Sequence, residues 1–227
     1  MYKPHGIIPA MVTPFNEDYS IDEEGLKELV QFLDAKGCHG ILVGGTTGEY
    51  TFMDKEERKK IIKLAVEAAD GRETTIMAGT GCHGTEQTIE LTQHAAEVGA
   101  DSVLILPTYY LETTTQGIID HYKRISESVD IPIVIYHYPA ASGVLLEPET
   151  ILELSKIDNI VGIKDTASMQ HTSQLLKLVE DRDDFTVLTG YEHLILPTLA
   201  CGGHGAVGIA HQVVPEELIE MYDLVTK

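Results

Sequence analysis

Tryptophan is absent from this 227-residue chain, and cysteine is scarce. The three cysteines, Cys38, Cys82 and Cys201, are an odd number without CxxC spacing, which disfavours a disulfide framework and a zinc site. No apolar run approaches the roughly 20 residues that are needed to cross a bilayer. The first residues also lack the basic start and apolar run of a signal peptide, so we expect a cytoplasmic protein without a membrane anchor.

Basic residues are few as well, since 16 Lys and Arg stand against 36 Asp and Glu, for a net charge of -20. Nucleic-acid binding depends on clustered cations that neutralise phosphates, so this composition argues against a nucleic-acid partner. It also disfavours an anionic membrane surface. A small anionic substrate remains compatible, because local groups in a cleft can outweigh the field of the whole protein.

Apolar segments of strand length alternate with amphipathic segments of helix length throughout the chain. The predicted strands are residues 6–14, 40–43, 74–78, 102–106, 132–136, 159–164, 185–189 and 205–208. The predicted helices are residues 22–36, 54–69, 84–98, 115–128, 147–154, 169–179, 192–200 and 215–225. No linker rich in Pro, Gly or Ser separates these units, so we expect one domain over residues 1–227.

Such regular alternation predicts a parallel sheet, and eight units predict a closed (β/α)₈ TIM barrel. The competing fold is a doubly wound open sheet. That fold normally carries a GxGxxG-like turn after its first strand, and the sequence Thr13-Pro14-Phe15-Asn16 is not one. In a TIM barrel the chemistry lies at the carboxyl ends of the strands, so the residues directly after each apolar run are the candidates.

Lys164 ends the apolar run 159–163. Burial lowers the pKa of a lysine, and a neutral amine can condense with a ketone to give a Schiff base. A lone lysine at a strand end more often extends its ammonium to water, so its neighbours decide the interpretation. Tyr136 ends the preceding strand and can transfer protons as a phenol, with Thr47 relaying a proton or orienting that hydroxyl. The turn 44–48 can offer backbone N–H groups to a carboxylate.

Four strings carry a resemblance to a known family: GGTTGE at 44–49, PTYY at 107–110, YHYP…SG at 136–143 and GIKDT at 162–166. In order and spacing they resemble the dihydrodipicolinate synthase and N-acetylneuraminate lyase family over essentially the whole chain. The resemblance implies a pyruvate-dependent class I aldolase with no cofactor and no metal. Lys164 then forms the Schiff base, and Tyr136 is the general acid and base.

The resemblance also assigns the remaining site residues. Thr46 and Thr47 bind the substrate carboxylate, and Tyr110 is the tyrosine that this family often lends across a subunit interface to complete a Thr–Tyr–Tyr proton relay. A homodimer or homotetramer is therefore expected. Further substrate contacts are expected from Thr166, Gly190, Glu192 and Val207.

Departures from the family pattern bear on the substrate. Ala141 stands where the synthases usually carry an arginine for the second substrate's carboxylate, and a lost bidentate partner disfavours that activity. Glu192-His193 replaces the usual Asp-Glu of the sialic acid lyases, and Ile209 replaces their usual serine.

The string YHYP…SG at 136–143, which begins at the end of the fifth predicted strand, is closest to that of the 2-keto-3-deoxy sugar acid aldolases. We therefore predict this aldolase activity as the function. The alternatives are 4-hydroxy-tetrahydrodipicolinate synthase and N-acetylneuraminate lyase activity. The family's usual C-terminal helical segment has no counterpart before Lys227.

Two other classes of function remain open. Ten histidines, of which His137, His193, His204 and His211 lie near strand ends, suggest a metal-dependent aldolase. No HxH or HExxH spacing supports it, so packing or surface histidines are the simpler interpretation. An inactive binding or regulatory barrel is the second alternative, and the intact Lys164 argues against it.

Overall fold

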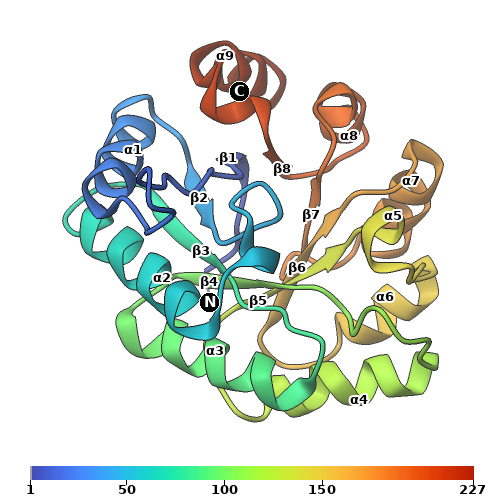
Figure 1. The fold of residues 1–227 in the computed structure, drawn as a ribbon. Helices are drawn as coiled ribbons and strands as arrows, with labels where there is room; N and C mark the ends of the chain where they lie inside the picture. Colours follow the sequence, from blue (N-terminus) through green and yellow to red (C-terminus); the bar gives the residue numbers. More distant parts are fainter. Residues whose placement is uncertain (1) are drawn as a thin grey trace.

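The computed structural model describes residues 2–227 and arranges them as eight strands, each followed by helix (Figure 1). The strands are β1 (Gly6–Pro9), β2 (Gly40–Val43), β3 (Thr75–Gly79), β4 (Ser102–Ile105), β5 (Ile133–His137), β6 (Ile160–Asp165), β7 (Thr186–Thr189) and β8 (Gly205–Gly208). The helices are α1 (Glu23–Ala35), α2 (Lys55–Ala69), α3 (Thr85–Val98), α4 (Thr115–Ser126), α5 (Pro139–Ser142), α6 (Pro148–Leu154), α7 (Met169–Leu178), α8 (Ile195–Ala200) and α9 (Pro215–Thr226). Short 3₁₀ turns are η1 (Tyr50–Phe52), η2 (Glu192–Leu194) and η3 (Ala210–Gln212).

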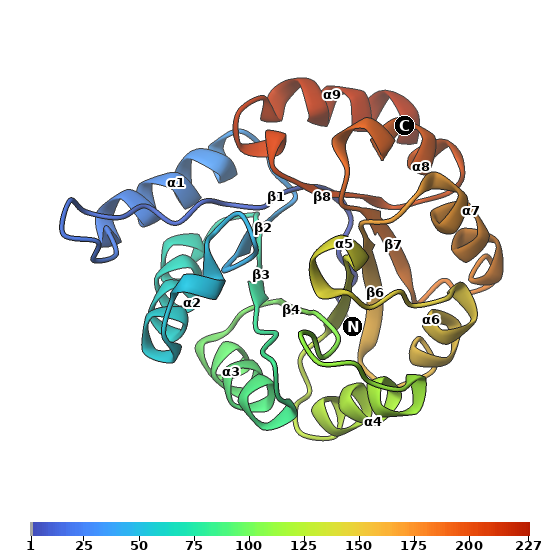
Figure 2. The ribbon, with the colours of Figure 1, turned by 45° about the vertical axis from the view of Figure 1, so that its right-hand side comes forward.

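The sheet is parallel and closes on itself. Its strand order is β1-β8-β7-β6-β5-β4-β3-β2, and a parallel bridge between Ala10 and Leu42 joins the two ends. The amide of Met11 donates to the carbonyl of Leu42 at 3.0 Å across the same join. In Figure 2 the helices form a ring around the strands, whereas the short α5 lies inside that ring. The predicted (β/α)₈ barrel is confirmed.

Successive strand residues point alternately into the barrel and out toward the helices, and each set forms its own apolar core. The inner core includes Ile8, Leu42, Met77, Val134, Leu188 and Val207. The outer core includes Ile41, Val43, Ile76, Ile135, Ile163 and Val187, which pack against the helices. This alternation determines which polar side chains reach the barrel interior and which reach the helix layer.

Helix starts follow local capping chemistry. Asp54 accepts the amide of Glu57, and the Glu57 carboxylate accepts the amide of Asp54, which is the capping box that the sequence predicts. Ser168 caps α7 by accepting the amide of His171. Helix α7 therefore begins only a few residues beyond the end of β6.

The predicted boundaries agree with the structure to within two residues except in two places. The first strand ends at Pro9 instead of residue 14, because the amide of Val12 turns away and donates to the side chain of Gln212. The helix expected over 192–200 is divided into η2 and α8. Within residues 2–227 no helix is both long enough and apolar enough to span a membrane.

Candidate active site

Lys164 and Tyr136 face each other inside the barrel. They are register partners on β6 and β5, and the Lys164 Nζ lies 4.4 Å from the centre of the Tyr136 ring. Lys164 is only 6% exposed. Burial lowers the pKa of its amine to about 8, and the nearby charge of Glu192 opposes that shift. A usable fraction of Lys164 is therefore a neutral nucleophile near neutral pH.

Tyr136 is placed to hold a proton beside that amine. Burial raises the pKa of its phenol to about 12, so the group is protonated at neutral pH. Its hydroxyl lies 3.5 Å from the Thr46 Oγ1. The sequence assigned this contact to Thr47, which makes no side-chain hydrogen bond within the described part of the chain. Both threonines lie in the turn that begins at Gly44, whose φ is +67°.

Thr166 and Gly190 shape the space around the lysine. The Thr166 Oγ1 is buried and has no hydrogen-bond partner among residues 2–227, so it is free to bind a substrate oxygen. A Cβ at position 190 would lie 2.0 Å from that Oγ1 and 3.1 Å from the Lys164 Cε. Only glycine leaves room there for both side chains, which supports the predicted place of these residues in the site.

Glu192 and Val207 have structural contacts of their own. The Glu192 Oε1 accepts the amides of Ile209 at 2.6 Å and Ala210 at 3.0 Å, so it holds the segment after β8. Its other carboxylate oxygen makes no hydrogen bond within residues 2–227. Val207 is fully buried in the inner core. Direct substrate contact by either residue stays a prediction.

Tyr110 lies apart from the other candidates. Its side chain is 87% exposed, and its backbone adopts a left-handed φ of +80°, which is uncommon for a residue other than glycine. No hydrogen bond within residues 2–227 joins it to Tyr136 or Thr46. A single chain does not bring the predicted relay tyrosine to the lysine.

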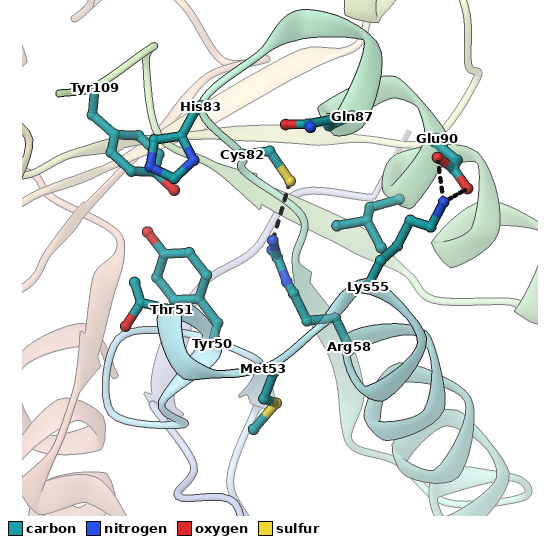
Figure 3. A pocket seen from close by; sticks show the side chains of 11 residues that line it. Tyr50, Thr51, Met53, Lys55, Arg58, Cys82, His83, Gln87, Glu90 and Tyr109 are labelled. Atoms are coloured by element: carbon teal, nitrogen blue, oxygen red, sulfur yellow. Dashed lines mark hydrogen bonds and ion pairs between the residues drawn. The ribbon is translucent and has the colours of Figure 1, made fainter. Parts of the chain in front are cut away.

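A cavity of about 510 Å³ lies beside α2 and the end of β4 (Figure 3). Arg58 projects toward it, donating to the carbonyls of Gly79 and Gly81 and to the Cys82 thiol. The guanidinium also lies 4.9 Å from the centre of the Tyr50 ring. Sequence reasoning missed Arg58, although a cation on the inner face of a helix must find such partners. Arg58 ties the turn after β3 to α2.

The histidines near strand ends do not form one cluster. Within residues 2–227, the one group of ligand-type atoms lying within 4.8 Å of one another comes from His137, Asp165 and His171. His193 is exposed, and the Nδ1 of His211 accepts a hydrogen bond from the amide of Gly208. Of the three residues in this group, sequence reasoning considered only His137 as a metal ligand. The position of His171, six residues after Asp165 on the next helix, was a signal it did not use.

The profile of the Dihydrodipicolinate synthetase family matches residues 3–227. The chain belongs to this family. Its members are class I aldolases that act through a lysine Schiff base, so the chain is an enzyme of the carbon–carbon lyase type.

Individual relatives agree with the family assignment. The 4-hydroxy-tetrahydrodipicolinate synthase of Methanothrix thermoacetophila is 41% identical over 217 residues, covering 95% of this chain and 72% of the relative. The corresponding synthase of Syntrophobacter fumaroxidans is 39% identical over 220 residues, covering 96% and 74%.

Solved structures share both sequence and architecture. Dihydrodipicolinate synthase from Aquifex aeolicus superposes with a TM-score of 0.93 at 37% identity, covering 97% of this chain and 75% of that one. YagE from E. coli K12, a prophage protein of the dihydrodipicolinic acid synthase family in complex with pyruvate, gives a TM-score of 0.92 at 32% identity, covering 95% and 73%.

Proposed function

We propose that this dihydrodipicolinate synthetase family member cleaves or forms a 2-keto-3-deoxy sugar acid, with pyruvate as the 2-oxo acid and a neutral hydroxyaldehyde as the second substrate. Lys164 forms the Schiff base. Thr46, Thr47 and Thr166 bind the pyruvyl carboxylate, and Gly190, Glu192 and Val207 complete the substrate pocket. The similarity to YagE, which binds pyruvate, supports the first substrate.

The cavity beyond Thr166 carries the choice of aldehyde. It measures about 790 Å³, and the residues lining it include no Lys, Arg, Asp or Glu. Both ring nitrogens of His171, which lies at its edge, are engaged by Asp165 and Leu146. Ala141, where the synthases usually carry arginine, is exposed and adds no charge. The polar groups that remain suit hydroxyls better than a carboxylate.

The chemistry follows from the pairing of one amine and one phenol. The neutral Lys164 Nζ attacks the C2 carbonyl of the 2-oxo acid, and the resulting carbinolamine hydroxyl leaves as water with the Tyr136 proton. The iminium then accepts the electron pair of the C3–C4 bond, while the Tyr136 phenolate removes the C4 hydroxyl proton. The aldehyde departs, and the enamine is protonated at C3. Hydrolysis then releases pyruvate and restores the amine.

A second copy of the chain completes the proposed relay. Phe52, Tyr110 and Leu111 are 85%, 87% and 74% exposed, which makes an apolar surface near the ends of β2 and β4. A homodimer or homotetramer formed there would bring the partner's tyrosine at position 110 to the Thr46–Tyr136 pair. The three cysteines are unpaired, in keeping with a cytoplasmic location.

4-Hydroxy-tetrahydrodipicolinate synthase activity is the second candidate. The names of relatives that are 37–41% identical favour it. In that case the second substrate is an aldehyde bearing a carboxylate and an amine, and the absence of Lys and Arg from the lining of the cavity counts against it.

A trapping and aldehyde-panel experiment separates these functions. Borohydride with pyruvate should add the mass of a reduced pyruvyl group at Lys164, and the Lys164→Ala variant should gain none. With pyruvate present, neutral hydroxyaldehydes such as glyceraldehyde should condense faster than aspartate semialdehyde. The reverse order selects the synthase. Trapping without condensation of any aldehyde leaves a binding or regulatory barrel.

A further inference from the structure

A buried polar network lies behind the proposed active site, on the outer face of the strands that carry it. The Asp165 carboxylate is fully buried and accepts hydrogen bonds from His137 at 2.7 Å, His171 at 3.0 Å and Thr172 at 2.7 Å. These partners come from β5 and α7, so one carboxylate connects three neighbouring elements of the barrel. The mechanism above uses none of these groups.

The backbone of Leu146 determines where the protons lie. Its amide donates to the His137 Nε2 at 3.1 Å, so that nitrogen is an unprotonated acceptor and the His137 proton lies on Nδ1, facing Asp165. Its carbonyl lies 2.8 Å from the His171 Nε2 and can only accept, so this nitrogen carries a proton. The His171 Nδ1 faces the carboxylate and must donate as well. His137 is therefore neutral, and His171 is a buried imidazolium.

Charge balance requires the same assignment. An isolated carboxylate without a counter-charge is costly in a protein interior, and His171 is the cation that contacts Asp165. Burial alone would raise the pKa of Asp165, but its three hydrogen bonds and the charge of His171 outweigh burial and lower the pKa to about 2. Burial alone would lower the pKa of His171, but Asp165, the Leu146 carbonyl and the charge of Glu147 raise it.

The network is mechanically linked to the catalytic pair. His137 and Asp165 are register partners on β5 and β6, and each directly follows a catalytic residue, Tyr136 or Lys164. The register of these strands changes between Ile133 and Val134, two residues before Tyr136. Because side chains alternate between the faces of a strand, a shift of the outer pair moves the inner pair with it.

We propose that His171 is a positioning residue, which as an imidazolium holds Asp165 and, through it, His137, so that β5 and β6 keep Tyr136 opposite Lys164. The proposal rests on the proposed roles of Lys164 and Tyr136. The nitrogen and oxygen atoms that could ligate a cation are already used in hydrogen bonds: both Nδ1 atoms donate to Asp165, which also accepts from Thr172, His137 Nε2 accepts the Leu146 amide, and His171 Nε2 donates to the Leu146 carbonyl. The proposed positioning role therefore requires no metal.

The protonation states can be measured in the wild-type protein without any reaction. Long-range ¹H–¹⁵N NMR spectra of the histidine rings at pH 7 should show His171 with two protonated nitrogens and His137 as the neutral Nδ1–H tautomer. His137→Asn and His171→Asn assign the signals. A neutral His171, or one equivalent of zinc in the purified protein, overturns the proposal.

Two matched variants test positioning. In His171→Asn, the side-chain amide nitrogen takes the place of the ring Nδ1 and keeps the hydrogen bond to Asp165. In His171→Gln, the side-chain amide nitrogen takes the place of the ring Nε2 and keeps the hydrogen bond to the Leu146 carbonyl. Each loses one hydrogen bond and the positive charge, so their melting temperatures should fall by similar amounts. His171→Gln should lower kcat roughly 10- to 100-fold by misplacing the reacting groups, with a smaller change in the KM for pyruvate. His171→Asn keeps the bond to Asp165 but loses the charge, so its loss of kcat should be smaller than that of His171→Gln.

Equal losses in the two variants, or a larger loss in His171→Asn, overturn the proposal. If neither variant folds, the ring protonation states of the wild type still decide whether the imidazolium exists. Wild-type protein that traps no pyruvate at Lys164 refutes the proposed function instead, and the NMR result stands independently of it.

Discussion

The two faces of the β5–β6 pair differ in how their polar groups are satisfied. On the inner face, the Lys164 Nζ lies 4.4 Å from the centre of the Tyr136 ring, and the Tyr136 hydroxyl has one long hydrogen bond of 3.5 Å, to the Thr46 Oγ1. On the outer face, Asp165 alone accepts three hydrogen bonds of 2.7 to 3.0 Å. The inner groups remain available for a substrate, and the outer groups are committed to the fold. Changes on the inner face should therefore affect chemistry, and changes on the outer face should affect stability and geometry.

The largest expected effect comes from the inner face. Tyr136→Phe removes the proton donor and should lower kcat by about 10²- to 10⁴-fold, the usual contribution of a general acid or base. Because the hydroxyl has only the contact to Thr46, the melting temperature should change little. Steady-state kinetics and thermal melting measure the two effects. Near-normal turnover would contradict the role of Tyr136.

An outer-face change should show the opposite behaviour. Asp165→Asn leaves His171 without its counter-charge and should destabilise the fold by about 2 kcal/mol, since folding lowers the pKa of Asp165 from 3.8 to about 2. The carboxylate stabilises the fold above about pH 4, and this stabilisation is lost as the pH falls through about 2. His171, whose pKa is raised, stabilises the fold below its ordinary pKa and loses this effect as the pH rises through its folded value.

Urea unfolding of wild type and Asp165→Asn from pH 2 to pH 9 tests that expectation. The stability difference should be largest between about pH 4 and pH 6.5 and smaller on both sides. A difference that does not change with pH would show that the hydrogen bonds matter without the charges.

A third prediction concerns the inner face alone and is the pH dependence of imine formation at Lys164. The neutral amine is the reactive form, and its pKa of about 8 means that its fraction rises about fivefold between pH 7 and pH 8. The rate of borohydride trapping with pyruvate should follow that rise. An ordinary lysine, with a pKa near 10.5, would instead show a tenfold rise per pH unit and no midpoint at 8. Intact-mass spectrometry over time measures the rate.

The smallest expected effect concerns the turn after β2. Thr46→Val removes the hydroxyl that contacts Tyr136 and should lower kcat by about 2- to 10-fold, which corresponds to one ordinary hydrogen bond. Thr47→Val is the matched control and should lower kcat less. Should Thr47→Val be the more damaging variant, the relay would run through the residue that the sequence indicated.

The fold was predictable because burial follows the period of each element. The predicted helix 54–69 is α2 (Lys55–Ala69), and the predicted strand 132–136 is β5 (Ile133–His137) within one residue. Most strand residues are apolar on both faces, as in a strand between an inner core and a helix layer. The largest boundary error lies where a side chain takes the place of a backbone hydrogen-bond partner: the side chain of Gln212 accepts the amide of Val12, and the first strand ends earlier than predicted.

The site was predictable in its residue types but not in all its contacts. Lys164 and Tyr136 could be paired because adjacent strands share a register. The choice between Thr46 and Thr47 depends on turn dihedral angles that the residue types leave open. The charge of His171 depends on the carbonyl of Leu146, 25 positions earlier in the chain. Composition and periodicity do not specify such a contact.

The backbone of Leu146 therefore has a consequence for redesign. This buried leucine lies between α5 and α6, in the part of the rim where a change of substrate preference would be attempted. A loop grafted onto residues 143–147 that moved the backbone amide and carbonyl of residue 146 would reassign the protons of two imidazole rings, although neither ring had been mutated. Variants in such a library would differ in the electrostatics beneath the reactive amine as well as in the shape of the pocket.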